Sequence, residues 1–183
     1  MLKKVCIFGS YKDLSKKQKD EVVRLGNLLA QKGATVISGG FGGTMEDISR
    51  GAKEGGGKTI GVTWYKWEKP IYSKANAFID EEIVADTLFE RIDIMLKQAD
   101  AFIVLPGGTG TLLELSAVLE HLNKGLIDPK PVIMLGDFWK PVFTCLKKEP
   151  VLSEKTKNKY KISCCSELVT FVKNVDECIE RLK

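Results

Sequence analysis

Residues 101–114 read A-F-I-V-L-P-G-G-T-G-T-L-L-E, and they hold the clearest structural pattern in the chain. The apolar residues come first, and no polar residue alternates with them. Such a run is typical of a strand in a parallel sheet that is covered on both faces. A turn of proline and glycines follows, and then residues with helical spacing begin. The stretch therefore predicts a strand that leads through a tight turn into a helix.

The same order of strand and helix recurs along the chain. Further apolar runs favour strands at residues 4–8, 34–38, 59–62, 132–135 and 168–172. Helical spacing favours helices over residues 17–31, 45–54, 85–97, 111–122, 137–147 and 175–182. The polar stretch 147–161 is expected to be a surface excursion. The alternation predicts an α/β fold, a Rossmann-like, doubly wound parallel sheet with helices on both faces, formed by residues 1–183 as a single domain.

The composition is that of an ordinary globular protein. Of the 183 residues, 44% are hydrophobic and 28% are charged, which excludes the disordered and fibrous classes. The net charge of +4 favours small anionic ligands but is too small to indicate nucleic-acid binding. No apolar run approaches the length of a membrane span, and the run at residues 5–8 is too short for a signal peptide. We therefore expect neither a membrane nor a nucleic-acid partner.

Cysteine and histidine usage bears on the compartment and on metal binding. The five cysteines are odd in number, lack a C-x-x-C pair and include the adjacent Cys164 and Cys165, which are poorly placed to bridge each other. This usage favours a reducing, cytoplasmic setting. The sequence has a single histidine, His121, so that no metal-ligand cluster with histidine spacing is available and no metal site is expected.

Two glycine-rich patterns resemble nucleotide-binding motifs but do not fit them. Residues 51–59, G-A-K-E-G-G-G-K-T, end like a P-loop, yet Ala52 stands where that pattern needs glycine. The segment also leads from a helix into a strand, which is the reverse of a P-loop. These glycines are interpreted as a helix end and a turn. Gly40-Phe-Gly42 begins the dinucleotide pattern, but Met45 takes the place of its third glycine.

Two other glycine-rich turns have the polarity that a phosphate site needs. Residues 38–46, S-G-G-F-G-G-T-M-E, and residues 106–114 each follow a strand and open a helix. The first N–H groups of such a helix are free, the helix dipole is positive there, and glycine lets a ligand oxygen approach. The residues expected to bind a small phosphorylated, nucleotide-like ligand are Gly9, Ser10, Gly39, Gly40, Gly42, Gly43, Thr44, Met45, Gly107, Gly108, Thr109, Gly110 and Thr111.

Charged and aromatic residues near these turns have structural as well as functional explanations. Thr111-x-x-Glu114 has the spacing of a helix capping box, and Glu114 is also a candidate catalytic carboxylate. An exposed ion pair on a helix is the default explanation for Arg91. Trp64, Trp67 and Trp139 are interpreted as packing residues, although Trp64 follows a strand end and could border the cleft.

The second turn carries a family resemblance. Pro106 to Glu114 matches P-G-G-x-G-T-x-x-E, the signature of the LOG ("Lonely Guy") family, long mislabelled as lysine decarboxylases. Arg91 lies fifteen residues before Pro106, where that family carries its arginine. The resemblance implies hydrolysis of the N-glycosidic bond of a nucleoside 5′-monophosphate, such as a cytokinin ribotide or AMP, to free base and ribose 5-phosphate. It also implies a homodimer or larger assembly with no metal or organic cofactor.

The resemblance implies a role for each matching residue. Glu114 is expected to stabilise the oxocarbenium-like transition state and to position or deprotonate water. Arg91 is expected to bind the carboxylate or the ribose side and to orient the leaving base. Residues 107–111 are expected to hold the 5′-phosphate, and this remote contact fixes the sugar in register.

Two positions depart from the family's pattern. Ile92 follows Arg91 where the enzymes usually have lysine, and Glu46 follows Met45 where they have glycine. The wording Thr44-Met45-Glu46 resembles a sister branch, the molybdenum-cofactor carrier proteins, which share the fold and bind a pterin phosphate without hydrolysing it. The alternative function is therefore a non-catalytic carrier or sensor of a phosphorylated pterin or nucleotide. Lysine decarboxylation is not expected, because no histidine precedes a lysine as in the pyridoxal-phosphate motif.

Overall fold

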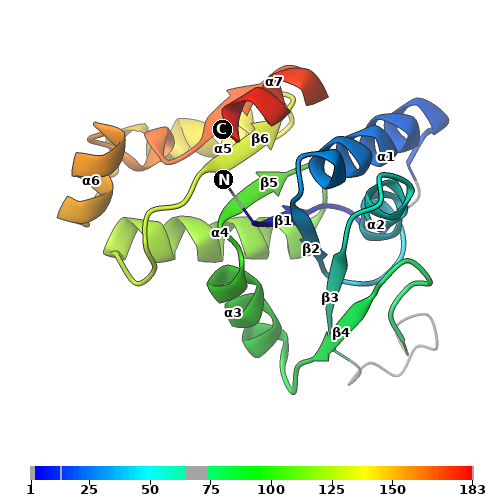
Figure 1. Ribbon diagram of the computed structural model, residues 1–183. Coiled ribbons are helices and arrows are strands. Elements are labelled where there is room, and N and C mark those ends of the chain that lie inside the picture. Colours follow the sequence, from blue (N-terminus) through cyan, green and yellow to red (C-terminus); the bar gives the residue numbers. More distant parts are fainter. Residues whose placement is uncertain (1–2, 13, 65–73, 183) are drawn as a thin grey trace.

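The computed structural model describes residues 3–12, 14–64 and 74–182. Within them, seven strands form one sheet in the order β4-β3-β2-β1-β5-β6-β7 (Figure 1), and every neighbouring pair is parallel. The strands are β1 (Lys4–Phe8), β2 (Thr35–Ser38), β3 (Thr59–Thr63), β4 (Glu81–Val84), β5 (Ala101–Val104), β6 (Val132–Leu135) and β7 (Thr170–Val172). The predicted parallel α/β fold is confirmed.

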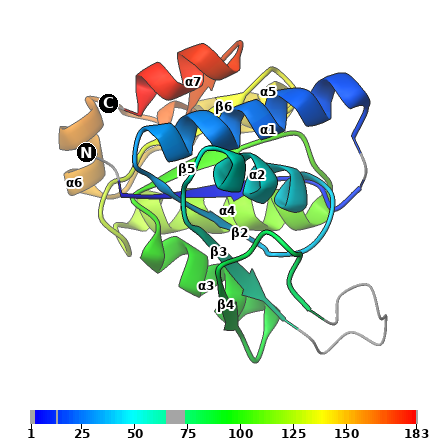
Figure 2. The same cartoon turned by 45° about the vertical axis from the view of Figure 1, so that its right-hand side comes forward.

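The helices cover the sheet on both faces. They are α1 (Lys16–Gln31), α2 (Thr44–Glu54), α3 (Leu88–Gln98), α4 (Thr109–Lys124), α5 (Lys140–Cys145), α6 (Glu154–Tyr160) and α7 (Val175–Arg181), with short 3-10 turns η2 (Leu146–Lys148) and η3 (Cys165–Glu167). The core has two halves: α1, α2 and α7 pack on one face, and α3, α4 and α5 pack on the other (Figure 2). This layering is why β5 and β6 are apolar along their whole length.

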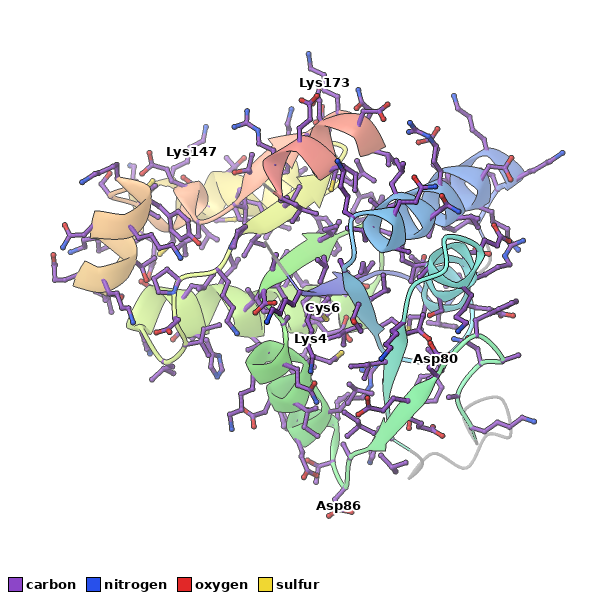
Figure 3. The ribbon with its side chains drawn as sticks, viewed as in Figure 1. Lys4, Cys6, Asp80, Asp86, Lys147 and Lys173 are labelled. Atoms are coloured by element: carbon purple, nitrogen blue, oxygen red, sulfur yellow. The ribbon has the colours of Figure 1, made fainter. Side chains whose placement is uncertain are left out.

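The central strand shows how the alternation of side chains feeds both halves of the core. Val5 and Ile7 of β1 face the half with α1, whereas Cys6 and Phe8 face the half with α3 and α4. All four side chains are almost fully buried. Cys6 lies near the middle of the molecule (Figure 3), and burial raises the pKa of its thiol well above the usual range. The five cysteines are all free in the structure.

Two elements differ from the sequence prediction. Strand β4 lies at the edge of the sheet, and three of its four residues are exposed, so that no apolar run marks it. Helix α6 lies within the stretch 147–161, for which the sequence predicted a surface excursion and no helix. Ser153 caps α6 by accepting a hydrogen bond from the backbone N–H of Thr156, whose side chain is fully buried.

The glycines of residues 51–57 have the structural role that the sequence predicts. Gly51 lies inside α2 where that helix crosses α1, and a Cβ there would overlap the backbone carbonyl of Val23. Gly55 ends α2, and Gly56 has a φ of 76°, which favours glycine. The Gly-Lys-Thr ending therefore closes a helix and begins β3, with no phosphate-binding geometry.

In the described parts of the chain, none of the helices is both long and apolar enough to cross a bilayer.

Candidate active site

The candidate site lies where the strand order changes direction. From β1 the chain adds β2, β3 and β4 on one side of the sheet and then returns to place β5 on the other side of β1. Ligands of open α/β sheets bind at such a point, outside the carboxyl ends of the strands. The turns that follow β1, β2 and β5 all open at this edge. The fold thus brings together the three segments in which the sequence predicted ligand contacts.

Arg91 of α3 is buried, and the default expectation of an exposed ion pair is wrong. Its side chain is only 8% exposed, because α3 turns this residue toward the sheet. Its Nε donates a hydrogen bond to the carbonyl of Val62 at 2.7 Å. One terminal nitrogen donates to Oε1 of Glu114 at 3.1 Å. The guanidinium also lies over the ring of Phe41, 5.7 Å from its centroid.

Glu114 of α4 is the partner of Arg91, and the capping-box interpretation is wrong. Helix α4 begins at Thr109 after Gly108, so Thr111 is inside the helix and is not its cap. The Glu114 carboxylate instead receives the hydrogen bond from Arg91, and its side chain is 11% exposed. Burial raises the pKa of Glu114, while the charge of Arg91 and its hydrogen bond act to lower it. Two charged groups are thus held together away from water, an arrangement that is costly unless both are paired.

Gly39 makes room for this arrangement. A Cβ at Gly39 would overlap a terminal nitrogen of Arg91, and it would also crowd the sulfur of Met45 at 2.6 Å. Glycine at this position therefore allows the guanidinium to lie against the β2–α2 turn. This role concerns the packing of Arg91 and is additional to the ligand contact that the sequence predicts for Gly39.

The N-terminus of α4 is open. Thr109 and Gly110 are exposed, and a Cβ at Gly108 or Gly110 would meet nothing within 4 Å. Among the described residues, the N–H groups of Thr109, Gly110 and Thr111 have no hydrogen-bond acceptor, and the first turn holds no acidic side chain. Helix N-termini of this kind bind anions. Thr111 differs from its neighbours, since its side chain is buried against Gly107.

The N-terminus of α2 is more occupied. The N–H of Thr44 donates to the carbonyl of Ser10 at 2.8 Å, and the N–H groups of Glu46 and Asp47 donate to the carbonyl of Gly43. The Thr44 hydroxyl is buried without a partner in the described structure, and it faces Gly9. Both Glu46 and Asp47 place carboxylates in the first turn. The two glycine-rich turns, which look equivalent in sequence, thus differ in free donors and in charge.

The histidine and the described tryptophans that the sequence singled out make contacts with backbone carbonyls. His121 is half-buried and its Nδ1 contacts the carbonyl of Ala117 at 2.7 Å. Trp139 is buried and donates to the carbonyl of Leu105 at 3.0 Å, as expected of a packing residue, whereas Trp67 lies outside the described residues. Trp64 donates to the carbonyl of Asp86 at 3.2 Å, which ties the end of β3 to the turn before α3 (Asp86 in Figure 3). Across the described residues, no group of three His, Cys, Asp or Glu side chains is placed to hold a metal ion.

Two residues of the site were not identified from the sequence. Phe41 lies among glycines, and its ring covers Arg91. Asn76 precedes β4 in a segment without a motif, yet it binds the backbone of the β2–α2 turn. An aromatic residue inside a glycine run is a signal that could have found Phe41. Nothing in the sequence around Asn76 marks its contact.

The sequence profile of the SLOG cluster4 family matches residues 2–169. The chain belongs to this family. The cytokinin riboside 5′-monophosphate phosphoribohydrolase of Mycobacterium marinum is 33% identical over 159 residues, which cover 85% of this chain and 80% of that protein. The protein of the same name from Mycobacterium tuberculosis is 39% identical over 117 residues, covering 63% of this chain and 60% of that protein. The resemblance to the LOG family is confirmed.

The chain spans 53% to 62% of the length of the matched relatives from Oryza sativa and Arabidopsis thaliana. Among solved structures, the molybdenum cofactor carrier protein of Chlamydomonas reinhardtii has a TM-score of 0.72 at 24% identity, covering 100% of this chain and 96% of that chain. DNA processing protein A of Helicobacter pylori, described as binding single-stranded DNA, has a TM-score of 0.58 at 15% identity, covering 98% and 80% of the two chains. At these identities the likeness shows a shared fold.

Proposed function

We propose that this SLOG cluster4 family member hydrolyses the N-glycosidic bond of a nucleoside 5′-monophosphate, an AMP-like nucleotide or a cytokinin ribotide, to free base and ribose 5-phosphate. The observation that carries the proposal is the buried Arg91–Glu114 pair beside the open N-terminus of α4. The pair supplies a fixed carboxylate. The first residues of α4 supply an anion site about one turn before Glu114 on the same helix. The names of the relatives support the same reaction.

The chemistry of the bond explains why such a pair is needed. Departure of the base leaves positive charge on the ribose ring, so the transition state resembles an oxocarbenium ion. The Glu114 carboxylate would stabilise that charge and take a proton from the attacking water. The neighbouring guanidinium favours the ionised carboxylate and so opposes the effect of burial, which raises the pKa of Glu114. Arg91 would therefore orient the carboxylate and help to orient the leaving base.

Phosphate binding would place the sugar. In this proposal, the free N–H groups of residues 109–111 hold the 5′-phosphate beside Gly107, with Gly108 and Gly110 giving access. The β2–α2 turn, residues 39–45, and the β1 end, Gly9 and Ser10, would line the other side of the ligand. A phosphate held at a distance from the bond that breaks fixes the reacting atoms in register. We further propose a homodimer or larger assembly in a cytoplasmic setting, with no cofactor and no nucleic-acid partner.

The experiment is direct. The protein is incubated with AMP, other nucleoside 5′-monophosphates and a cytokinin ribotide, and free base is measured by chromatography. We expect release from at least one monophosphate, none from the matching nucleoside, and loss of release in Arg91→Ala. Absence of base from every monophosphate would contradict the proposal.

The second candidate is a carrier or sensor of a phosphorylated pterin or nucleotide. It is favoured by Glu46, whose exposed carboxylate lies 3.9 Å from the Cβ position of Gly42 at the rim of the site, where the resembling enzymes have glycine. Stoichiometric binding of AMP without turnover, with Glu46→Gly leaving turnover absent, would support the carrier. Turnover by the unaltered protein that Arg91→Ala abolishes excludes it.

A further inference from the structure

Asn76 makes an unusually complete set of contacts with the β2–α2 turn. Its backbone N–H donates to the carbonyl of Gly40 at 2.8 Å. Its side-chain amide donates to the carbonyls of Gly40 and Phe41 at 3.1 and 2.9 Å. Its Oδ1 accepts from the N–H of Phe78 at 3.0 Å, which fixes the side chain in one orientation. Asn76, thirty-five positions after Phe41 in the sequence, thus binds two consecutive carbonyls of the turn.

These two carbonyls need an outside partner because of the shape of the turn. Gly40 has a φ of 77° and Gly43 a φ of 63°, so the backbone between them leaves the strand without entering the helix. The carbonyls of Gly40 and Phe41 therefore belong to neither the β2 ladder nor the α2 helix. Asn76 satisfies both of them, and the turn is fixed in a single path.

The path of the turn decides where the Phe41 ring lies. The ring centroid is 5.7 Å from the central carbon of the Arg91 guanidinium, in the geometry of a cation–π contact. The same guanidinium is held from other directions by the carbonyl of Val62 and by Glu114. Asn76 itself does not touch Arg91 in any hydrogen bond; it acts on the backbone that carries Phe41.

We propose that Asn76 is a positioning residue of the site, which acts through Phe41 to hold the Arg91 guanidinium against Glu114. The contact between Asn76 and Phe41 is part of the fold and does not depend on the reaction. Its catalytic consequence rests on the proposed hydrolase function, so the test has one measurement that needs activity and one that does not.

The variant Asn76→Asp isolates this contact with little change in side-chain size. A carboxylate has no N–H to donate, and at neutral pH its negative charge repels the two carbonyls that the amide binds. The turn is expected to leave its path, and the Phe41 ring to leave Arg91. Phe41→Leu removes the ring alone and keeps an apolar side chain. Asn158→Asp, at an exposed position of α6, is the matched control for the charge, and Phe89→Leu, at an exposed position of α3, is the control for the loss of a ring.

The first measurement is the NMR signal of the Arg91 Nε–H group. A hydrogen-bonded, buried Nε–H exchanges slowly with water, and a ring over the guanidinium displaces its resonance. Arg91→Lys identifies the signal by removing it. We expect Asn76→Asp and Phe41→Leu to move the signal to the same degree and to speed its exchange with water, and Phe41→Tyr to keep it in place. Both controls are expected to leave it unchanged.

The second measurement is the kinetics of base release from AMP. Misplacement of a catalytic group by a fraction of an ångström to about 1 Å lowers rates by roughly 10- to 100-fold. We expect Asn76→Asp to lower kcat within this range and to raise KM by a smaller factor, since the displaced turn also lines the ligand in the proposed function whereas the α4 phosphate site is untouched. The control variants Asn158→Asp and Phe89→Leu are expected to retain kcat, because both side chains are exposed and make no contact with the turn.

The outcomes separate the two proposals. If the unaltered protein releases no base but the Arg91 signal responds to Asn76→Asp as expected, the hydrolase proposal fails and the positioning role stands. If folded Asn76→Asp leaves the Arg91 signal in place, the positioning role is overturned whatever the activity. If Asn76→Asp does not fold, the decision passes to Asn76→Ser, which retains a single donor: a smaller displacement of the signal supports the role, and no displacement contradicts it.

Discussion

Glu114 lies in surroundings that oppose its own charge, and among the described residues it is Arg91 that compensates. The pair is buried, so removing the charge of one partner leaves the other without a counter-charge in a site poor in water. Both residues could be identified from the sequence, Glu114 from the glycine-rich motif and Arg91 from its distance to that motif. Their contact could not be predicted, because it depends on α3 and α4 meeting at the sheet. Phe41 and Asn76 were missed for the same reason, since a turn's path is set by tertiary hydrogen bonds.

Replacing the Glu114 carboxylate by an amide is expected to damage activity far more than stability. Glu114→Gln keeps the shape but removes the proposed general base, which contributes about 10²- to 10⁴-fold to such rates. Because the raised pKa of Glu114 means that its ionisation opposes folding, the neutral amide is not expected to lower the free energy of unfolding through the loss of charge. Base release and urea unfolding measure the two effects. The matched control is Glu120→Gln, whose carboxylate is exposed on the same helix; loss of base release in this control, or a loss of stability confined to Glu114→Gln, would contradict the expectation.

The pH dependence of the reaction should report the ionisation of Glu114. Burial raises the pKa of this carboxyl above its usual range, and Arg91 opposes that rise. Because hydrolysis needs the ionised form, kcat/KM should fall on acidification at a higher pH than an ordinary glutamate would give. Arg91→Gln removes the opposing charge, so the acid limb in its residual activity should move to still higher pH. A limb that moves to lower pH in this variant would show that another group titrates.

The same raised pKa has a consequence for stability. A carboxyl whose pKa is higher in the folded than in the unfolded state favours folding while it is protonated. That contribution is present below the unfolded-state pKa and is lost as the pH rises through the folded-state pKa. Ionisation of Glu114 therefore opposes folding, and its contribution to the free energy of unfolding should decrease as the pH rises through the raised pKa of this carboxyl.

At the scale of elements, the helix N-termini explain why one glycine-rich turn suits phosphate better than the other. Helix α4 has free N–H groups and no acid in its first turn, whereas α2 has donated N–H groups and two acids. The sequence identifies both turns. It does not show that the carbonyls of Ser10 and Gly43 accept hydrogen bonds from the first N–H groups of α2, because these contacts form only in the folded turn. Strand β4 and helix α6 were missed because their residues are mostly exposed, so that apolar periodicity does not mark them.

A carboxylate in the first turn of α4 should separate phosphate binding from helix stability. Gly110→Asp places an acid where a Cβ meets no atom within 4 Å, so no steric change is expected. An acid there suits the helix dipole, so stability should be retained or raised slightly. It repels a phosphate, so KM for AMP should rise about tenfold or more. Gly110→Ala is the control; an equal rise in KM for both variants would mean that flexibility, and not charge, is what the site requires.

At the scale of the whole molecule, the parallel sheet and its two helical layers followed from the sequence because the apolar runs of β1, β5 and β6 do not alternate with polar residues. The order of the strands did not follow, since the apolar runs of β1 and β5 carry no information on which neighbours they choose. The return from β4 to β5 is what creates the site, by bringing the turn after β5 beside the turn after β1. The fold class can thus be predicted from short segments of the sequence, whereas the candidate site depends on the order of the strands in the sheet.

The close crossing of α1 and α2 provides a test of which glycines serve the scaffold and which serve the site. Gly51→Ala places a methyl group against the carbonyl of Val23 in the middle of the crossing, where neither helix backbone has space to accept it. The expected loss is about 1–3 kcal/mol in the free energy of unfolding, as for other overpacked positions. Turnover per folded molecule should be unchanged, because Gly51 lies in the helix body and not at the sheet edge that holds Arg91. Urea unfolding measures the loss of stability, and base release from AMP measures the turnover. A fall in kcat or a rise in KM in the folded protein would instead give the Gly51–Gly57 segment a role in ligand binding.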